Sequence, residues 1–357
     1  MRVKLDKVCK RIYAGGDVPK DRYSTVKTAE CAIPIYANAE KDNGLYGYTD
    51  TARENELSIT VAARGTIGFT AIRREPFLPV VRLITVVPDL STVSERYLYY
   101  ALRNCKPASS GTSIPQLTVP DIKKNEIELY SLSVQETIAD KLDAVGRVIE
   151  LRQQQLQTLD ELVKARFIEL FGDPVLNQHG WRKVALEVNA TLLNGRAYKQ
   201  DELLDSGKYP VLRVGNFFSN RGWYYSDLEL DDDKYCDNGD LLYAWSASFG
   251  PQIWNGGKVI YHYHIWKVLV GEAYNRQFLC KLLEYATESL MGDTHGIAMM
   301  HLTKSGMEKT EFIVPPIERQ EQFAAFVEQA DKSKVAVQKA LDEAQLLFDS
   351  LMQKYFG

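Results

Sequence analysis

The chain has few of the residues and patterns that mark disulfide-rich, secreted or membrane-spanning proteins. Its five cysteines are scattered and form no C-x-x-C pair, so neither a disulfide framework nor a zinc ribbon is expected (Cys9, Cys31, Cys105, Cys236 and Cys280). Residues 1–7 lack the apolar core of a signal peptide. The most hydrophobic stretch, 77–87, contains Pro79 and Arg82 and is too short to span a bilayer. We therefore expect a cytoplasmic protein with no membrane partner.

Sequence signatures of catalysis are also lacking. The chain has no G-x-G-x-x-G after a predicted strand, no G-x-S-x-G and no H-E-x-x-H. Residues 250–258 resemble a phosphate loop, but the spacing differs and Val259 follows the lysine where Ser or Thr is required. We expect no catalytic residue and no cofactor.

Two further features were considered as metal sites. His262 and His264 alternate in a predicted aromatic strand over 261–266, a pattern more typical of packed or surface histidines than of ligands without a second cluster nearby. The run 231–233 of three aspartates is typical of a solvated turn, with a metal site as the alternative. No metal is expected.

The charge is nearly balanced, with 43 Lys and Arg against 47 Asp and Glu and a net charge of −4. This balance argues against a uniformly basic nucleic-acid coat, although a local basic surface is compatible with it. Residues 1–132 carry +4, residues 173–317 carry −4, and each of the segments 133–172 and 318–357 carries −2. Any contact of residues 173–317 with phosphate therefore requires that this region segregate its charges.

An internal repeat organises the chain. Residues 133–172 align without a gap on 318–357 at an offset of 185, which places Gln135 on Gln320. In both segments apolar residues recur with alternating spacings of four and three, the pattern of a coiled-coil helix. Each segment is therefore predicted to form one long helix with an apolar stripe.

The ends of the first long helix have their own signals. Ser133 with Glu136 resembles a capping box, and Gly172 followed by Pro174 is a typical helix stop. Either the two apolar stripes pack on each other or each covers its own domain. Three charged residues inside the stripes either fix the register or extend to solvent (Arg152, Arg166 and Lys334).

The regions before the two helices, 1–132 and 173–317, have similar lengths and similar order. Each shows short strand-like runs separated by glycine-containing turns, then a shorter helix and a closing strand. We expect an α+β protein with two α/β domains in tandem, separated by two long coiled-coil helices. Its predicted parts are domains at 1–132 and 173–317 and helices at 133–172 and 318–357.

Several polar loops are candidates for ligand contact. Residues 63–68 place an arginine beside two glycines, and residues 109–116 are rich in hydroxyl and amide groups that can contact phosphates and base edges. In the second half the counterparts are 245–250 and 292–301, where His301 falls on Gln116 at the offset of 185. The alternative interpretation of each loop is an ordinary polar turn.

Four stretches, taken in this order and spacing, resemble the specificity subunit of type I restriction-modification systems over essentially the whole chain. They are Gly65-Thr66-Ile67-Gly68, the run from Gly111 to Leu117, the run from Phe167 to Pro174, and the run from Val314 to Glu321. One departure concerns the proline-rich exit before each long helix. The second repeat has Pro315-Pro316, whereas the first has Tyr130-Ser131.

The resemblance implies a non-catalytic DNA reader with two target recognition domains, each reading one half of a bipartite, asymmetric site in double-stranded DNA. It implies that the long helices pack antiparallel, set the distance between the half-sites and dock two methyltransferase subunits, which bind S-adenosylmethionine. A restriction subunit with motor and nuclease activity joins for cleavage. The alternative function is a coiled-coil scaffold whose globular domains bind proteins rather than DNA.

Candidate DNA contacts were chosen from side chains that pair with phosphates or base edges. In the first domain they are Arg64, Thr66, Thr112, Ser113 and Gln116, with Lys41, Tyr46 and Tyr48 as outer candidates. In the second domain they are Ser246, Ser248, Lys258, Arg276, His295 and His301.

Overall fold

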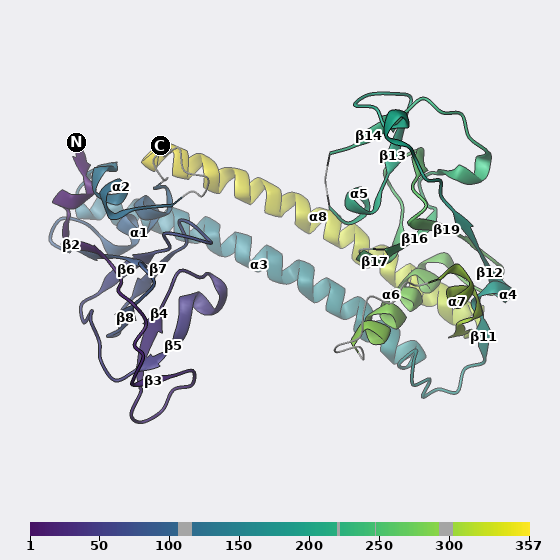
Figure 1. The fold of residues 1–357 in the computed structure, drawn as a ribbon, viewed down its shortest axis with the longest axis horizontal. Coiled ribbons are helices and arrows are strands. Elements are labelled where there is room, and N and C mark those ends of the chain that lie inside the picture. The colour runs from purple at the N-terminus through teal and green to yellow at the C-terminus, as the bar shows by residue number, and fades with distance from the viewer. Residues whose placement is uncertain (106–115, 220–221, 247, 293–302) are drawn as a thin grey trace. The chain divides into compact units, whose positions relative to one another are not determined.

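The computed structural model describes residues 1–105, 116–219, 222–246, 248–292 and 303–357 (Figure 1). The chain divides into two compact units: unit 1 comprises residues 1–154 and 338–357, and unit 2 comprises residues 155–337. The helices α3 (Leu132–Phe171) and α8 (Ile317–Phe356) have 40 residues each. Each unit therefore contains about half of each long helix. No helix in the described ranges combines the length and apolarity needed to cross a membrane.

Unit 1 is built from two four-stranded sheets and a two-stranded one. The first sheet has the order β2 (Cys9–Ala14), β9 (Ile84–Pro88), β6 (Ser58–Val61) and β7 (Thr70–Arg73). The second has the order β3 (Tyr23–Ser24), β5 (Leu45–Thr49), β4 (Ile33–Tyr36) and β8 (Leu78–Pro79). The remaining elements are β1 (Arg2–Lys4) paired with β10 (Glu126–Glu128), η1 (Leu5–Lys7), η2 (Lys41–Gly44), α1 (Glu95–Arg103) and α2 (Val119–Lys124).

Unit 2 repeats this topology. Its first sheet has the order β12 (Ala190–Asn194), β19 (Ile265–Val270), β16 (Leu241–Ser246) and β17 (Ser248–Ile253). Its second has the order β14 (Tyr224–Ser226), β13 (Tyr209–Leu212), β18 (Val259–Tyr261) and β15 (Tyr235–Cys236). The remaining elements are β11 (Lys183–Ala185) paired with β20 (Glu311–Ile313), α4 (Leu186–Asn189), η3 (Gln200–Glu202), α5 (Val214–Phe218), η4 (Asp232–Lys234), α6 (Arg276–Gly292) and α7 (Lys304–Lys309). Both α7 and β20 begin 185 residues after their counterparts α2 and β10.

The apolar stripes of the long helices pack on each other and also complete the core of each unit. In unit 1, Leu142 of α3 and Phe348 of α8 are buried in one cluster with Tyr97 of α1. In unit 2, the rings of Phe167 in α3 and Phe323 in α8 lie 5.4 Å apart between centroids. Because the start of α3 meets the end of α8 in unit 1 and the reverse holds in unit 2, the helices are antiparallel. The interpretation in which the stripes pack on each other is confirmed.

The charged residues within the stripes keep their charge accessible. The Lys334 ammonium lies 2.6 Å from the Asp160 carboxylate on the opposite helix. Arg166 instead pairs with Glu169 one turn along its own helix, at 2.7 Å. Lys334 thus links the two helices through an ion pair, and the Arg166 guanidinium also reaches the opposite helix, where its carbon lies 6.0 Å from the centroid of the Phe326 ring.

A buried glutamine anchors each long helix to its unit. Gln135 is fully buried, and its amide donates to the carbonyl groups of Thr92 and Tyr130 while its oxygen accepts from the Ser94 N–H. Gln320 makes the equivalent three bonds to Ala273, Pro315 and Asn275. The offset that aligned the two glutamines in the sequence therefore corresponds to one repeated structural contact.

The structure corrects three local predictions. Helix α3 begins at Leu132, and Glu136, expected to cap it with Ser133, instead pairs with Arg96 of α1. One of the strand-like runs of the first half, residues 80–87 within the hydrophobic stretch, is interrupted, because β8 ends at Pro79 and β9 begins only at Ile84. The aromatic strand expected over 261–266 is likewise broken after Tyr261, which places both histidines at a turn rather than on one strand face.

Candidate nucleic-acid interface

The loop between β6 and β7 of unit 1 presents the first candidate residue. The N–H of Ala62 donates to the Phe69 carbonyl at 2.8 Å and closes the loop, while Gly65 and Gly68 adopt φ values of +70° and +85°. This left-handed conformation favours glycine, which explains the spacing of the motif. Arg64 is exposed on the loop, and its guanidinium donates to the Gln116 side-chain oxygen at 2.8 Å. Two predicted contact residues are thus brought together from positions 52 residues apart.

Asn38 joins this loop to a second exposed arginine. Its side-chain amide donates to the Val81 carbonyl at 2.5 Å, and its oxygen accepts from the Ala63 N–H at 2.8 Å. Val81 and Arg82 form the turn before β9 with φ values of +52° and +62°. The Asn38 side chain therefore connects the two segments that carry Arg64 and Arg82.

These two arginines differ from the paired cations of unit 1, such as Arg11 and Arg96. Within the described ranges, neither Arg64 nor Arg82 has a carboxylate within ion-pair distance. A guanidinium that is exposed and not neutralised can pair bidentately with a phosphate or with the O6 and N7 atoms of guanine. The pattern of the sequence did not indicate Asn38 or Arg82, because Arg82 falls within an apparent hydrophobic strand.

The other predicted residues of unit 1 are more scattered. Thr66 is exposed on the same loop as Arg64, and Lys41 is exposed in η2. Tyr46 and Tyr48 lie on β5 in the second sheet, where Tyr46 is 49% exposed and stacks obliquely on Tyr23. No hydrogen bond or ring contact among the described residues joins these tyrosines to Arg64. Thr112 and Ser113 lie outside the described residues.

In unit 2 the predicted residues do not form one cluster. Ser246 and Ser248 face each other at the end of the β16–β17 hairpin. The Lys258 ammonium lies 4.6 Å from the centroid of the Tyr235 ring, and Arg276 donates to the Gly239 carbonyl at 2.6 Å. Arg276 therefore holds the start of α6 to a neighbouring turn. His295 and His301 lie outside the described residues.

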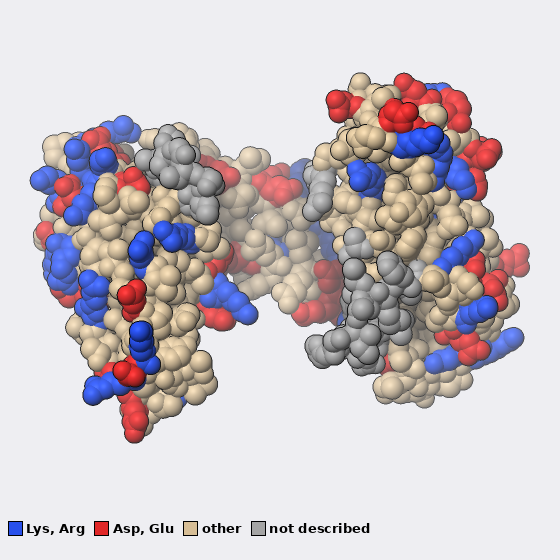
Figure 2. Space-filling view, viewed as in Figure 1, with Lys and Arg blue, Asp and Glu red and all other residues tan. Residues whose placement is uncertain are grey.

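Figure 2 shows acidic side chains at the end of unit 2 that carries β14, with basic ones among them, and further acidic side chains elsewhere on the same unit. Glu229 pairs with Lys208, and Asp233 pairs with the adjacent Lys234 at 2.6 Å. Within the described ranges no group of three or more His, Cys, Asp or Glu residues could hold a metal ion.

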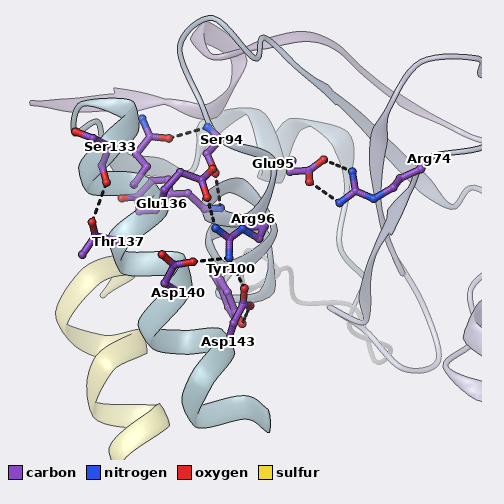
Figure 3. A network of polar contacts seen from close by, with 12 residues as sticks. Arg74, Ser94, Glu95, Arg96, Tyr100, Ser133, Glu136, Thr137, Asp140 and Asp143 are labelled. Carbon is purple, nitrogen blue, oxygen red and sulfur yellow. Dashed lines mark hydrogen bonds and ion pairs between the residues drawn. The ribbon is translucent and has the colours of Figure 1, made fainter.

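A charged network of unit 1 around Arg96 serves the fold rather than a ligand (Figure 3). Arg96 of α1 lies among three carboxylates of α3: it is 2.7 Å from Asp140 and from Asp143, and it also pairs with Glu136. These partners raise the pKa of Arg96, chiefly through the hydrogen bond to Asp143. The Tyr100 hydroxyl donates to Asp143 at 2.5 Å. Because carboxylates outnumber the guanidinium, this network would repel DNA and instead fastens α1 to α3.

Comparison with known proteins identifies the family to which the chain belongs. A sequence model described as the type I restriction modification DNA specificity domain matches residues 1–161 and, a second time, residues 179–344. The protein named "Putative type I specificity subunit S.MpnORF507P" of Mycoplasma pneumoniae is 34% identical over 169 residues, which cover 44% of this chain and 46% of that protein. A second relative of the same description and organism is 37% identical over 164 residues, or 43% of this chain and 48% of that protein. The matched part thus spans about half the length of each relative.

A solved structure shares the fold over the full length. The crystal structure of a type I restriction-modification system S subunit from M. genitalium has a TM-score of 0.61 and 15% identity, covering 100% of this chain and 96% of that chain. At this identity the likeness concerns the fold alone. The fold class predicted from the repeat, two α/β domains in tandem with two long antiparallel helices, is confirmed.

Proposed function

The chain belongs to the family of type I restriction-modification DNA specificity domains, and from this membership we propose that it is the sequence-reading subunit of a type I restriction-modification complex. Each unit reads one half of a bipartite, asymmetric site in double-stranded DNA. The subunit itself is not catalytic. It directs methyltransferase subunits, and through the complete complex a restriction subunit, to that site in the cytoplasm.

The observation that carries this proposal is the exposed Arg64–Gln116 pair on a glycine-shaped loop of unit 1. Guanidinium and carboxamide groups are the side-chain groups that form bidentate contacts with guanine and adenine in the major groove. Gln116 orients the guanidinium before DNA arrives, which lowers the entropic cost of the contact. The tandem topology then supplies a second reader for the second half-site.

The long helices fit the role of spacer and docking surface. Several large apolar side chains on them are exposed, including Leu151 at 53%, Leu162 at 49%, Val335 at 72% and Leu346 at 70%. Exposed apolar side chains on a helix pair are suited to cover by a protein partner. We assign this surface to the two methyltransferase subunits, and we assign the separation of the half-sites to the length of the helices.

The test is methylation mapping of DNA from cells that express the chain with the methyltransferase subunit of its own system. We expect a bipartite methylated motif. In the variant Arg64→Gln one half of that motif should become degenerate, since loss of a base-reading arginine costs about 1–3 kcal/mol at one position. The matched control is Arg74→Gln, because Arg74 is exposed but already paired with Glu95. A single continuous motif, or no methylation directed by the chain, would contradict the two-reader function and favour the scaffold alternative.

A further inference from the structure

Unit 2 repeats the turn that carries Arg82 in unit 1, but with histidines in it. The N–H groups of Val80 and His262 donate to the carbonyls of Tyr36 and Leu212, the last residues of β4 and β13, both at 2.9 Å. The next N–H of each turn also has an equivalent partner. The Val81 N–H donates to the Gly16 carbonyl at 2.8 Å, and the Tyr263 N–H donates to the Arg196 carbonyl at 3.0 Å. Residues 262–265 therefore occupy the place of residues 80–83, and His264 stands where Arg82 stands.

Both turns are tied to the neighbouring hairpin through the same carbonyl position. In unit 1 the Asn38 amide donates to the Val81 carbonyl. In unit 2 the Trp245 indole N–H donates to the Tyr263 carbonyl at 2.8 Å, and the Trp245 backbone N–H donates to the His264 carbonyl at 3.0 Å. The two units thus place a turn at the same point of the fold with different side chains on it. The backbone of the two turns differs, because Val81 and Arg82 have positive φ values whereas Tyr263 and His264 do not.

The turn of unit 2 borders a cleft of about 630 Å³ with an unusual lining. Arg213, Trp223, Tyr224 and both turn histidines line it, and none of its lining residues is acidic. Two clefts of unit 1 are different, because one is lined by Asp6 and Glu54 and the other by Glu40. A cleft that lacks carboxylates in an acidic unit is suited to an anionic or electron-rich ligand.

Arg213 is the cation of this cleft. Its guanidinium carbon lies 5.1 Å from the centroid of the Tyr224 ring, and within the described ranges no carboxylate pairs with it. The ring orients the guanidinium without neutralising it, and its hydrogen-bond donors stay available. Asn216 supports the cleft wall, since its amide donates to the Gly222 carbonyl at 3.2 Å.

His262 supplies an uncharged donor beside Arg213. Its Nδ1 accepts from the His264 N–H at 3.5 Å, a contact that favours the neutral tautomer with its proton on Nε2. Burial, with the neighbouring His264 and Arg213, lowers the pKa of His262 to about 4, so the ring is neutral at physiological pH. A neutral N–H donor can distinguish acceptor atoms on base edges, whereas a charged one also favours phosphates.

We propose that the cleft bounded by Arg213, His262 and His264 is where unit 2 reads the bases of its half-site, with Arg213 and the Nε2–H of His262 as the reading groups. This inference rests on the proposed function of the chain. It assigns to unit 2 a reading surface equivalent in place to the one that carries Arg64 and Arg82 in unit 1. On this inference Arg213, rather than Lys258 or Arg276, is the principal cation of unit 2 that contacts DNA.

The test uses the full chain in complex with its methyltransferase subunits and three duplexes built on the mapped motif: the intact site and two sites with one half scrambled. Binding is measured by competition for wild type, Arg213→Gln, His262→Phe, Arg64→Gln and the control Lys208→Gln. Lys208→Gln removes an equal charge from the same unit, at a residue that pairs with Glu229 and does not line the cleft. Thermal melting verifies that each variant is folded.

We expect Arg213→Gln to bind the intact site about 10-fold or more weakly and to lose discrimination at one half-site only. His262→Phe should weaken discrimination at that same half, and Arg64→Gln at the other. A uniform loss on all three duplexes, or an effect of Arg213→Gln no larger than that of Lys208→Gln, would overturn the assignment while leaving the proposed function intact. If the wild-type complex itself does not discriminate among the duplexes, the proposed function fails instead.

Discussion

Arginine side chains in this protein differ in function according to what neutralises them. Arg96 is surrounded by three carboxylates and therefore fastens two helices. Arg73 is buried, and its guanidinium lies 3.6 Å from the centroid of the Tyr36 ring and donates to the Asn43 carbonyl. Arg64 and Arg213 are exposed and lack a carboxylate partner within the described ranges. Only the last kind retains the charge and the donors needed to bind DNA.

The Arg96 network gives the first prediction at this scale. Replacing Arg96 with Met leaves three neighbouring carboxylates without their cation, so repulsion adds to the lost hydrogen bonds. Because the carboxylates are partly solvated, we expect a loss of about 1–2 kcal/mol in the free energy of unfolding at pH 7. Urea titration measures it. Arg74→Met, which removes a guanidinium with a single carboxylate partner, should cost less. Equal losses for the two variants would show that the network contributes nothing specific.

His262 gives a prediction with a definite sign in pH. Its pKa is about 4 in the folded chain, below the ordinary histidine value of 6.5, so the unfolded chain takes up the proton first as the pH falls. The stability associated with the neutral ring is fully present above pH 6.5 and is lost between pH 6.5 and about 4. With partial solvation the loss is on the order of 2 kcal/mol.

The measurement compares wild type with His262→Gln, which does not titrate in this range, by urea unfolding at pH 7.5 and pH 4.5. The gap between the two proteins should be larger at pH 7.5. His264 shares the direction of the effect, because burial also lowers its pKa. Parallel pH dependence of wild type and variant would contradict the assigned environment of His262.

At the scale of elements, the glutamine contacts determine how each long helix is anchored. Gln135→Ala would leave two backbone carbonyls and the Ser94 N–H buried without partners. Unsatisfied buried groups cost roughly 1–3 kcal/mol each before relaxation, so we expect a loss of about 3 kcal/mol in the free energy of unfolding. Gln157→Ala is the matched control, since Gln157 is exposed and contacts only Glu161 on its own helix. Denaturant unfolding that showed equal losses for the two variants would rule out an anchoring role.

The long helices and the repeat were predictable because their signals are periodic and local. The apolar spacing of four and three is visible in one segment and recurs 185 residues later. The turns at 80–83 and 262–265 were not predictable, because their β-branched and aromatic residues favour strands. Hydrogen bonds from Val81 to Gly16 and from Tyr263 to Arg196, partners that are distant in sequence, impose the turns instead.

The candidate site likewise combines residues that the local sequence indicates with residues that only the folded chain brings together. Arg64 was identified because the two glycines beside it mark a loop, and Gln116 because it lies in an amide-rich motif. Their hydrogen bond, however, depends on the folded chain. Asn38, Arg82 and Arg213 carry no local signal, since each becomes a candidate only through the segment that folding places beside it. The sequence therefore indicated candidate DNA-contact residues where glycines mark a loop. It did not indicate the candidate residues that come together only through tertiary packing.

For the whole molecule, net charge predicts how the chain binds DNA on its own. The two helix segments carry −2 each, and the acidic excess of residues 173–317 cancels the basic excess of residues 1–132. The chain as a whole has no positive net charge to concentrate at the DNA, so we expect few counterions to be released on binding. The full chain alone should bind DNA weakly, with a slope of log affinity against log salt of roughly −2 to −4.

The complex with methyltransferase subunits should have a steeper slope, because the partners add phosphate contacts that this acidic chain does not provide. Affinities of the chain and of the complex for the mapped site, measured at several salt concentrations between about 50 and 200 mM, test this directly. Identical slopes would mean that the phosphate contacts belong to this chain. A steeper slope for the complex would mean that the chain mainly selects the sequence, while its partners supply much of the electrostatic attraction that holds the DNA.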